Sequence, residues 1–414
     1  MELLEIGPRP VLRSYIANAI AVSQHAFTNL CALTTTRSAG GWTGVPPNRP
    51  HWCPCSASLL GVTDATFNAP SGARYSEIAE DLAVLGQAFG LGEVRECRFL
   101  SDGLMNGNWR LDTAEGSFAL KRIMDVPLPL ARRNLAVLAE LTDNGLPVGR
   151  ARLSVAGDAV VEVAGRGYCL LPWMEGSHLP GTALSIGQAG DLGVLLGRIH
   201  RSLNSERLAG LLPPGPEQVT VSVTKPASAR GEADRFLALI AGLKNRTAFD
   251  VEATAALAER KVLLEKYGHE RPAGEVAVGP AGWTHGDVQH RNVLWQDGEI
   301  VGVIDWDRIR VRPFGEDVAR TATVQFGGED GFLDLERTSA FVAGYRSVVP
   351  LPVSALADAV ERLWWKRMSD YWQLVFHYDR DDHSCDHLFL PTERFLAWWT
   401  ERREDVQEAF EAMP

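Results

Sequence analysis

The sequence of 414 residues has no long apolar run, no basic leader and few cysteines. No stretch approaches the roughly 18 uninterrupted apolar residues that a membrane-spanning helix needs. The first residues, Met1–Glu5, are acidic where a secretory signal is basic. The 6 cysteines are scattered through a chain that is large enough to fold without disulfides. These absences predict a cytoplasmic protein with no membrane partner.

An excess of positive charge is also missing. The chain has 41 Lys and Arg residues and 52 Asp and Glu residues, so its formal net charge is −11. This balance argues against nucleic-acid partners and anionic membranes, because both attract basic surfaces, and it suits cationic small molecules. Hydrophobic residues make up 45% of the chain, as in ordinary globular proteins, and the length suggests two or three compact units.

The N-terminal part differs from the rest in composition. Residues 34–72 are rich in Thr, Ser, Gly, Pro and Asn, a mixture that disfavours regular elements. We therefore expect residues 1–74 to form a poorly ordered extension whose removal preserves activity. His51, Cys53 and Cys55 leave a metal site open as an alternative, although zinc sites usually contain two ligand pairs and no second pair follows nearby.

Beyond this extension the pattern changes from strand-like to helical. A helix is expected to begin after Ser76 and to end near Gly90, with apolar residues at helical spacing. Strand patterns separated by turn residues follow, with one further helix among them. The expected strands are 97–100, 108–111, 117–123, 159–163 and 168–171, and the expected helix is 129–144. The sequence predicts an α+β chain with a small β-rich unit, 75–174, before a larger helical unit, 175–414.

Polar residues with metal-binding chemistry flank a predicted hairpin. His285-Gly286-Asp287 leads into Asn292, and Ile304-Asp305-Trp306-Asp307 follows the second strand. An Asp-Gly turn at 297–298 joins the two strands, so antiparallel pairing brings Asn292 and Asp305 to the same end. Oxygen ligands of this kind suit Mg²⁺, which usually takes one or two carboxylates together with substrate phosphates. Phosphoryl transfer further needs a carboxylate that orients the attacking hydroxyl, and Asp287 is the candidate.

These segments resemble the aminoglycoside phosphotransferase and choline kinase superfamily, which carries H-G-D-x-x-x-x-N and I-D-W/F-[DE]. The resemblance covers the chain from about residue 75 onward. It implies a two-lobed protein-kinase-like fold with a small β-rich N-lobe and a larger helical C-lobe. It also implies that Asp287 is the catalytic base, that His285 braces the catalytic loop, and that Asn292 and Asp305 bind Mg²⁺. Asp307 has no assigned role beyond a supporting or exposed position.

The resemblance places the ATP site in the small lobe. Phe118-Ala119-Leu120-Lys121 is similar to the family's phosphate-contacting strand, which makes Lys121 the expected phosphate ligand. The weakly glycine-rich hairpin 101–108 resembles the family's first hairpin, so Asn106 is expected to contact the nucleotide. Strand 168–171 resembles the family's hinge strand, so Leu171 and Trp173 are expected to lie beside the adenine.

The family often has a helix glutamate that pairs with this lysine. Asn134 stands in that register, and Glu140 is the nearest acidic alternative on the same helix. The acidic partner of Lys121 is therefore unassigned.

The acceptor is expected to be a small molecule with a hydroxyl group. Acidic and aromatic residues between 370 and 387 suit an amino-bearing acceptor such as an aminoglycoside or amino alcohol, and a solvated loop between helices is the alternative. His383, Cys385 and His387 also suggest a metal site, but no fourth ligand is evident. The expected function is an ATP- and Mg²⁺-dependent small-molecule kinase, an enzyme of the kind that confers antibiotic resistance. A metabolic kinase for choline, homoserine or a sugar, and a catalytically idle nucleotide-binding module, stay open.

Overall fold

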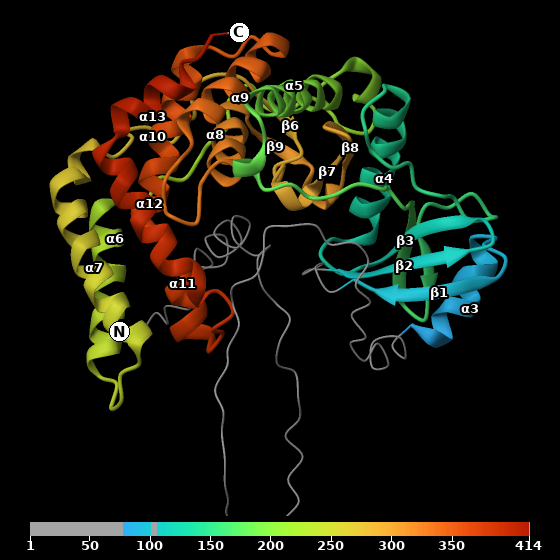
Figure 1. The fold of residues 1–414 in the computed structure, drawn as a ribbon, viewed down its shortest axis with the longest axis horizontal. Coiled ribbons are helices and arrows are strands. Elements are labelled where there is room, and N and C mark those ends of the chain that lie inside the picture. Colours follow the sequence, from blue (N-terminus) through green and yellow to red (C-terminus); the bar gives the residue numbers. More distant parts are fainter. Residues whose placement is uncertain (1–77, 101–105, 414) are drawn as a thin grey trace, which may run out of the picture.

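The computed structural model describes residues 78–100 and 106–413, which form two lobes (Figure 1). The predicted N-terminal extension, the Ser76 cap and the candidate ligands His51, Cys53 and Cys55 lie outside the described residues. In the part of the chain that the structure describes, no helix is both long and apolar enough to cross a membrane.

The small lobe is built on an antiparallel sheet of five strands in the order β1-β2-β3-β5-β4. The strands are β1 Val94–Phe99, β2 Gly107–Thr113, β3 Gly116–Ile123, β4 Val161–Val163 and β5 Arg166–Pro172. Two helices accompany them, α3 Ala79–Ala88 and α4 Leu128–Asp143. All five predicted strands and the helix 129–144 are present, with ends shifted by a few residues. The division of the chain near residue 174 stays a prediction.

The two sides of this sheet have different partners. Phe118 and Leu120 of β3 pack with Leu82 and Leu85 of α3 in one apolar cluster. The side chain of Lys121 instead reaches residues of the large lobe. The side chains of β3 therefore serve two faces, because successive side chains of a strand point to opposite sides of the sheet.

The large lobe is mainly helical and contains two small hairpin-like sheets. Its strands are β6 Ala281–Thr284, β7 Val293–Gln296, β8 Glu299–Val303 and β9 Arg310–Pro313, paired as β6-β9 and β7-β8. Its longer helices are α5 Ile186–Leu203, α6 Pro226–Ala241, α7 Ala248–Tyr267, α8 Phe314–Gln325, α9 Leu335–Val348, α10 Val353–Ser369, α12 Phe389–Glu401 and α13 Arg403–Phe410. The short α11 Trp372–Leu374 runs into a π-helical turn, Val375–Asp379.

The helices of this lobe pack closely around a core that contains large aromatic residues. Helices α5 and α9 lie close together, since a Cβ at Gly193 would overlap the carbonyl oxygen of Phe341. Trp364, Trp365 and Trp399 are buried in the core, and Trp398 is half-buried against it.

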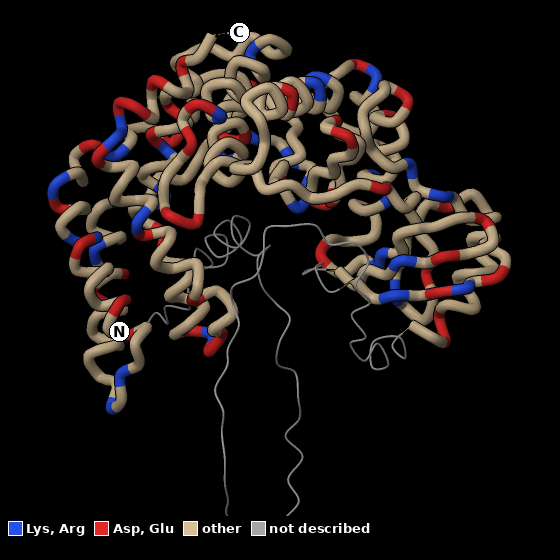
Figure 2. The backbone as a smooth tube through the Cα atoms, viewed as in Figure 1, with Lys and Arg blue, Asp and Glu red and all other residues tan. Residues whose placement is uncertain are grey.

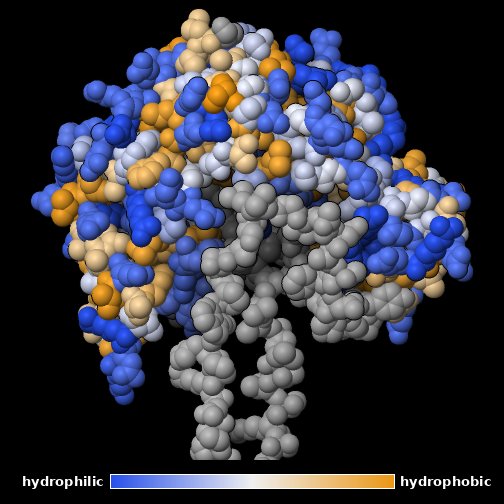
Figure 3. All heavy atoms as spheres, viewed as in Figure 1, coloured by the Kyte–Doolittle hydropathy of each residue, from blue (hydrophilic) through white to orange (hydrophobic). Residues whose placement is uncertain are grey.

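Charged residues of both signs lie on both lobes of the described part of the chain. Figure 2 shows basic and acidic residues interspersed over both lobes. The face in Figure 3 is mainly hydrophilic, with apolar residues scattered over it.

Candidate active site

The loop after β6 holds His285 and Asp287 in the interior. Both side chains are buried. The Nε2 atom of His285 lies 3.1 Å from the carbonyl oxygen of Ile304, and its Nδ1 accepts a hydrogen bond from the backbone N–H of Asp287. Burial lowers the pKa of His285 below its ordinary value, so the ring is neutral and donates from Nε2. His285 thus joins the loop to the end of β8, which is the bracing role that the resemblance implies.

Gly286 between them is required by the backbone and by a neighbouring arginine. Its φ angle is +77°, and a Cβ there would overlap the guanidinium of Arg312 on β9. That guanidinium donates a hydrogen bond of 2.9 Å to the hydroxyl of Thr284. The glycine of the His-Gly-Asp segment therefore leaves room for an arginine from another strand.

The carboxylate of Asp287 is held by three side chains. Arg320 of α8 donates to its Oδ1 at 2.6 Å, and Gln289 and Asn292 donate to its Oδ2, each at 3.2 Å. Asn292 also donates to the backbone carbonyl of Asp287 at 2.8 Å. These contacts fix the direction of the carboxylate. Sequence reasoning missed Arg320, whose contact with Asp287 depends on how helix α8 packs against the loop.

The hairpin β7-β8 places Asn292 and Asp305 as predicted. Val293 pairs with Val303, and the backbone N–H of Ile304 donates to the carbonyl of Asn292 at 2.9 Å. Asp305 follows at once with φ 63° and ψ 63°, a left-handed conformation that Asp tolerates better than most residues. The backbone thus brings the two residues to one end of the hairpin, and their side chains offer an amide oxygen and a carboxylate, the donor chemistry that Mg²⁺ prefers.

Lys121 reaches this site from the small lobe. Its Nζ lies 2.6 Å from Oδ2 of Asp307 and 3.5 Å from Oδ1 of Asp305. Burial alone would lower the pKa of Lys121, but the two carboxylates outweigh it and raise the pKa above its ordinary value. Asp307 is therefore the acidic partner that the sequence left unassigned.

Helix α4 contributes an amide where the family often has a glutamate. Asn134 donates from Nδ2 to the carbonyl oxygens of Trp306 and Asp307, each at 3.0 Å. Glu140, the acidic alternative, instead pairs with Arg207 at 2.6 Å. The residue in the glutamate register thus holds the backbone of the turn that carries Asp307.

The other predicted nucleotide residues have structural partners. Asn106 donates to Oδ2 of Asp307 at 2.8 Å and accepts from the backbone N–H groups of Met124 and Asp125. Leu171 of β5 pairs with Ala119 of β3, which lies two residues before Lys121 on that strand.

Trp173 follows β5. Its backbone N–H donates to the carbonyl of Ser117 at 3.0 Å, and Arg110 stacks on its ring. Nucleotide contact by Asn106, Leu171 and Trp173 stays a prediction.

A second buried network joins helices α5, α8 and α9. Asp317 accepts a hydrogen bond of 3.0 Å from His200 of α5, and the other ring nitrogen of His200 lies 2.9 Å from the hydroxyl of Tyr345. Burial raises the pKa of Asp317, but its hydrogen bond to His200 and the charges of Arg312 and Arg320 lower it to about 2. Asp317 thus has a structural role on α8, where it pairs with His200 of α5.

The acidic and aromatic region between 370 and 387 is partly committed to internal contacts. Asp379 forms a bidentate pair with Arg235 of α6, and Tyr378 donates to Asp250. The sequence suggests a metal site at His383, Cys385 and His387, but among the described residues the structure does not bring these three ligand atoms together. Cys385 is buried, and the ring of His383 lies near His377 and Asp386 instead.

The chain matches the profile of a phosphotransferase enzyme family over residues 96–351, which is more than half of its length. It is also 27% identical over 318 residues to the homoserine kinase of Gluconacetobacter diazotrophicus, a match that covers 72% of this chain and 89% of that kinase. The chain belongs to the phosphotransferase enzyme family.

Two solved structures share the fold. A spectinomycin phosphotransferase in complex with ADP and spectinomycin has a TM-score of 0.52 and 17% identity, covering 80% of this chain and 97% of that one. An amicoumacin kinase in complex with AMP-PNP and Ca²⁺ has a TM-score of 0.50 and 19% identity, covering 81% and 94%. These likenesses confirm the predicted two-lobed, protein-kinase-like fold.

Proposed function

We propose that this member of the phosphotransferase enzyme family transfers the terminal phosphoryl group of ATP to a hydroxyl of a small amino-bearing molecule. The observation that carries the proposal is the approach of Lys121, from the small lobe, to Asp305 and Asp307 of the large lobe. A cation from one lobe thus approaches carboxylates from the other, and the phosphates and metal of a bound nucleotide need groups of both kinds. Phosphoryl transfer depends mainly on such positioning and charge stabilisation.

Each side chain has a distinct role in this proposal. Asp287 orients the acceptor hydroxyl and accepts its proton at a carboxylate oxygen, while Arg320 and the two amides keep that carboxylate in place. Lys121 binds phosphate oxygens. Asn292 and Asp305 are the oxygen donors that would hold Mg²⁺, and the bound metal would neutralise charge on the phosphates.

The acceptor class rests on different support. The homoserine kinase of Gluconacetobacter diazotrophicus and the spectinomycin phosphotransferase are named for acceptors that carry both hydroxyl and amino groups. The net charge of −11 favours cationic acceptors. We take an aminoglycoside-like or other amino-bearing hydroxyl compound as the first candidate. Homoserine is the second candidate, favoured by the sequence match that spans 89% of that kinase.

A panel of acceptors tests the proposal. Release of ADP from ATP and Mg²⁺ would be measured with homoserine, spectinomycin, an aminoglycoside, choline and a sugar, each against the rate without acceptor. We expect at least one amino-bearing acceptor to raise the rate, and Asp287→Asn to lower that rate by about 10²–10⁴-fold. Asp191→Asn, at an exposed position on α5, is the matched control and should keep the full rate.

The idle nucleotide-binding module makes the opposite prediction. It would bind ATP while no acceptor in the panel raised ADP release above the background rate. An Asp287→Asn variant with the wild-type rate would also contradict the assigned base. A panel without activity would thus contradict the kinase function, whereas an active Asp287→Asn variant would contradict only the assignment of Asp287.

A further inference from the structure

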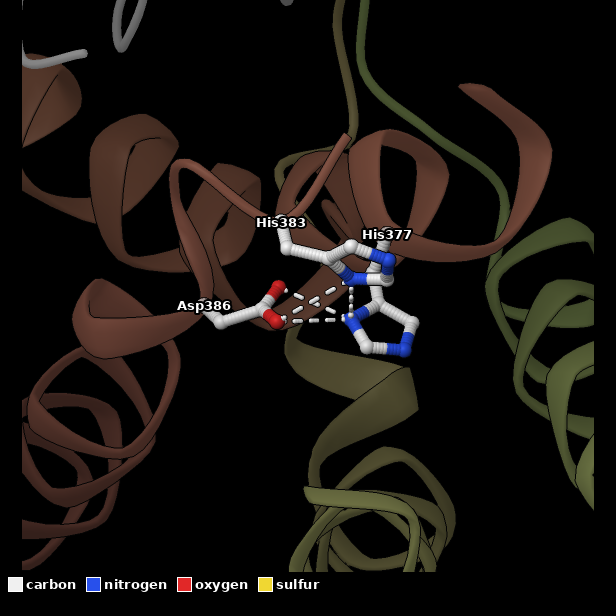
Figure 4. Close-up of side chains that lie close together, drawn as sticks. All are labelled: His377, His383 and Asp386. Carbon is white, nitrogen blue, oxygen red and sulfur yellow. Dashed lines mark hydrogen bonds and ion pairs between the residues drawn. The ribbon is translucent and has the colours of Figure 1, made fainter. Parts of the chain in front are cut away.

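A second cluster of ligand-type side chains lies outside the candidate active site, in the segment between α11 and α12. His377, His383 and Asp386 converge there, as Figure 4 shows. His377 belongs to the π-helical turn, and Asp386 begins the short 3₁₀ turn that precedes α12. Segments nine residues apart in the sequence are thus brought together through their side chains.

The spacing of the three groups suits one tetrahedral metal ion. Nδ1 of His377 lies 2.8 Å from both oxygens of Asp386 and 3.0 Å from Nδ1 of His383. Nδ1 of His383 lies 3.4 Å from Oδ2 of Asp386. Bonds of about 2.0–2.1 Å around tetrahedral zinc separate neighbouring ligand atoms by about 3.3 Å. The three atoms therefore form one face of a tetrahedron of the right size.

Two imidazole nitrogens that point at each other need a cation or a proton between them. We propose that His377, His383 and Asp386 bind Zn²⁺, with the fourth position open to water. Imidazole nitrogen and carboxylate oxygen are both zinc ligands, and sites with three protein ligands keep one open position. The bound ion would close the loop 377–386 and fix the approach to α12.

The surroundings hold the ligands in place. The ring of His377 stacks on Phe249 of α7, with centroids 4.1 Å apart, and its side chain is only 10% exposed. The other ring nitrogen of His383 lies 3.5 Å from Oδ1 of Asp381. Carboxylates in this outer position orient metal-bound histidines. His383 is 57% exposed, so the ion has an entry path from solvent.

Direct metal binding by the full chain is the test. Zn²⁺ titrated into metal-free protein by calorimetry should bind, and His383→Ala and Asp386→Asn should each weaken that site at least tenfold. Zn²⁺ should also raise the melting temperature of the wild-type chain and not that of the two variants. Co²⁺ in the same site should show the intense visible absorption of tetrahedral coordination.

Matched variants exclude other ligands. His269→Ala removes an exposed histidine elsewhere, and His387→Ala removes the histidine of the sequence-based alternative; both should bind Zn²⁺ as the wild type does. The titrations would be repeated in a Cys53→Ser/Cys55→Ser background to remove a competing thiolate site. Metal-free variants must melt as the metal-free wild type does; a variant that does not is replaced by His383→Gln. The proposal would be overturned if the wild-type chain did not bind Zn²⁺. It would also be overturned if His387→Ala, or the Cys53→Ser/Cys55→Ser variant by itself, lost Zn²⁺ binding.

Discussion

Replacing Asp307 by Asn removes the negative charge nearest to Lys121 and keeps the shape of the side chain. The two charged atoms are 2.6 Å apart, and the side chains are only 13% and 16% exposed. Removing one partner of a fully buried pair costs about 3–5 kcal/mol, and exposed pairs contribute about 0–1 kcal/mol. Asp305 remains 3.5 Å from Lys121 and compensates in part. We therefore expect Asp307→Asn to lower the free energy of unfolding by about 2 kcal/mol.

A similar free energy should be lost from transition-state stabilisation if Lys121 contacts the phosphates in the transition state. At 1.36 kcal/mol per factor of ten, about 2 kcal/mol corresponds to roughly a 30-fold fall in kcat/KM for ATP. Initial rates at varied ATP would measure it, with urea unfolding alongside. Glu140→Gln is the control, because Glu140 pairs with Arg207 and should leave kcat/KM unchanged. Wild-type kcat/KM in Asp307→Asn, or an equal loss in Glu140→Gln, would refute this pairing.

Three further changes probe the metal, the loop and the buried network. Asp305→Asn should weaken ATP binding at least tenfold in Mg²⁺ and little in chelator, as measured by calorimetry. Gly286→Ala should lower the melting temperature sharply, because its φ of +77° and the guanidinium of Arg312 both oppose a Cβ. The lowered pKa of Asp317, about 2 against 3.8, stabilises the fold above pH 4, and about 2 kcal/mol is lost as the pH falls from about 4 to 2. Urea unfolding at pH 7 and pH 3 would show that loss, and Asp317→Asn should reduce it.

Local patterns carried most of the prediction of the fold. The strands of the small lobe were predictable because turn residues separate the short strand-like runs. The positions of Asn292 and Asp305 were predictable for the same reason, since a two-residue Asp-Gly turn fixes the register of the hairpin.

Contacts between distant segments were not predictable in this way. Arg320 meets Asp287 across 33 residues, and Lys121 meets Asp307 from the other lobe. No periodicity encodes such pairs, because they depend on how the two lobes and helix α8 pack. The metal-ligand cluster was missed for a similar reason. A spacing rule joined His383 to Cys385, whereas the π-helical turn brings His377 beside it.

The exchange of a helix glutamate for Asn134 changes how the small lobe can control the site. In protein kinases, the position of the corresponding helix determines whether the lysine pair forms. Here the partner of Lys121 is Asp307, two residues after Asp305, and Asn134 binds the backbone of that turn. Because that acid is not on α4, a shift of α4 would act on the lysine pair through the hydrogen bonds of Asn134 to this turn. The lysine pair and the candidate metal ligand Asp305 therefore share one turn, and a displacement of that turn would move both together.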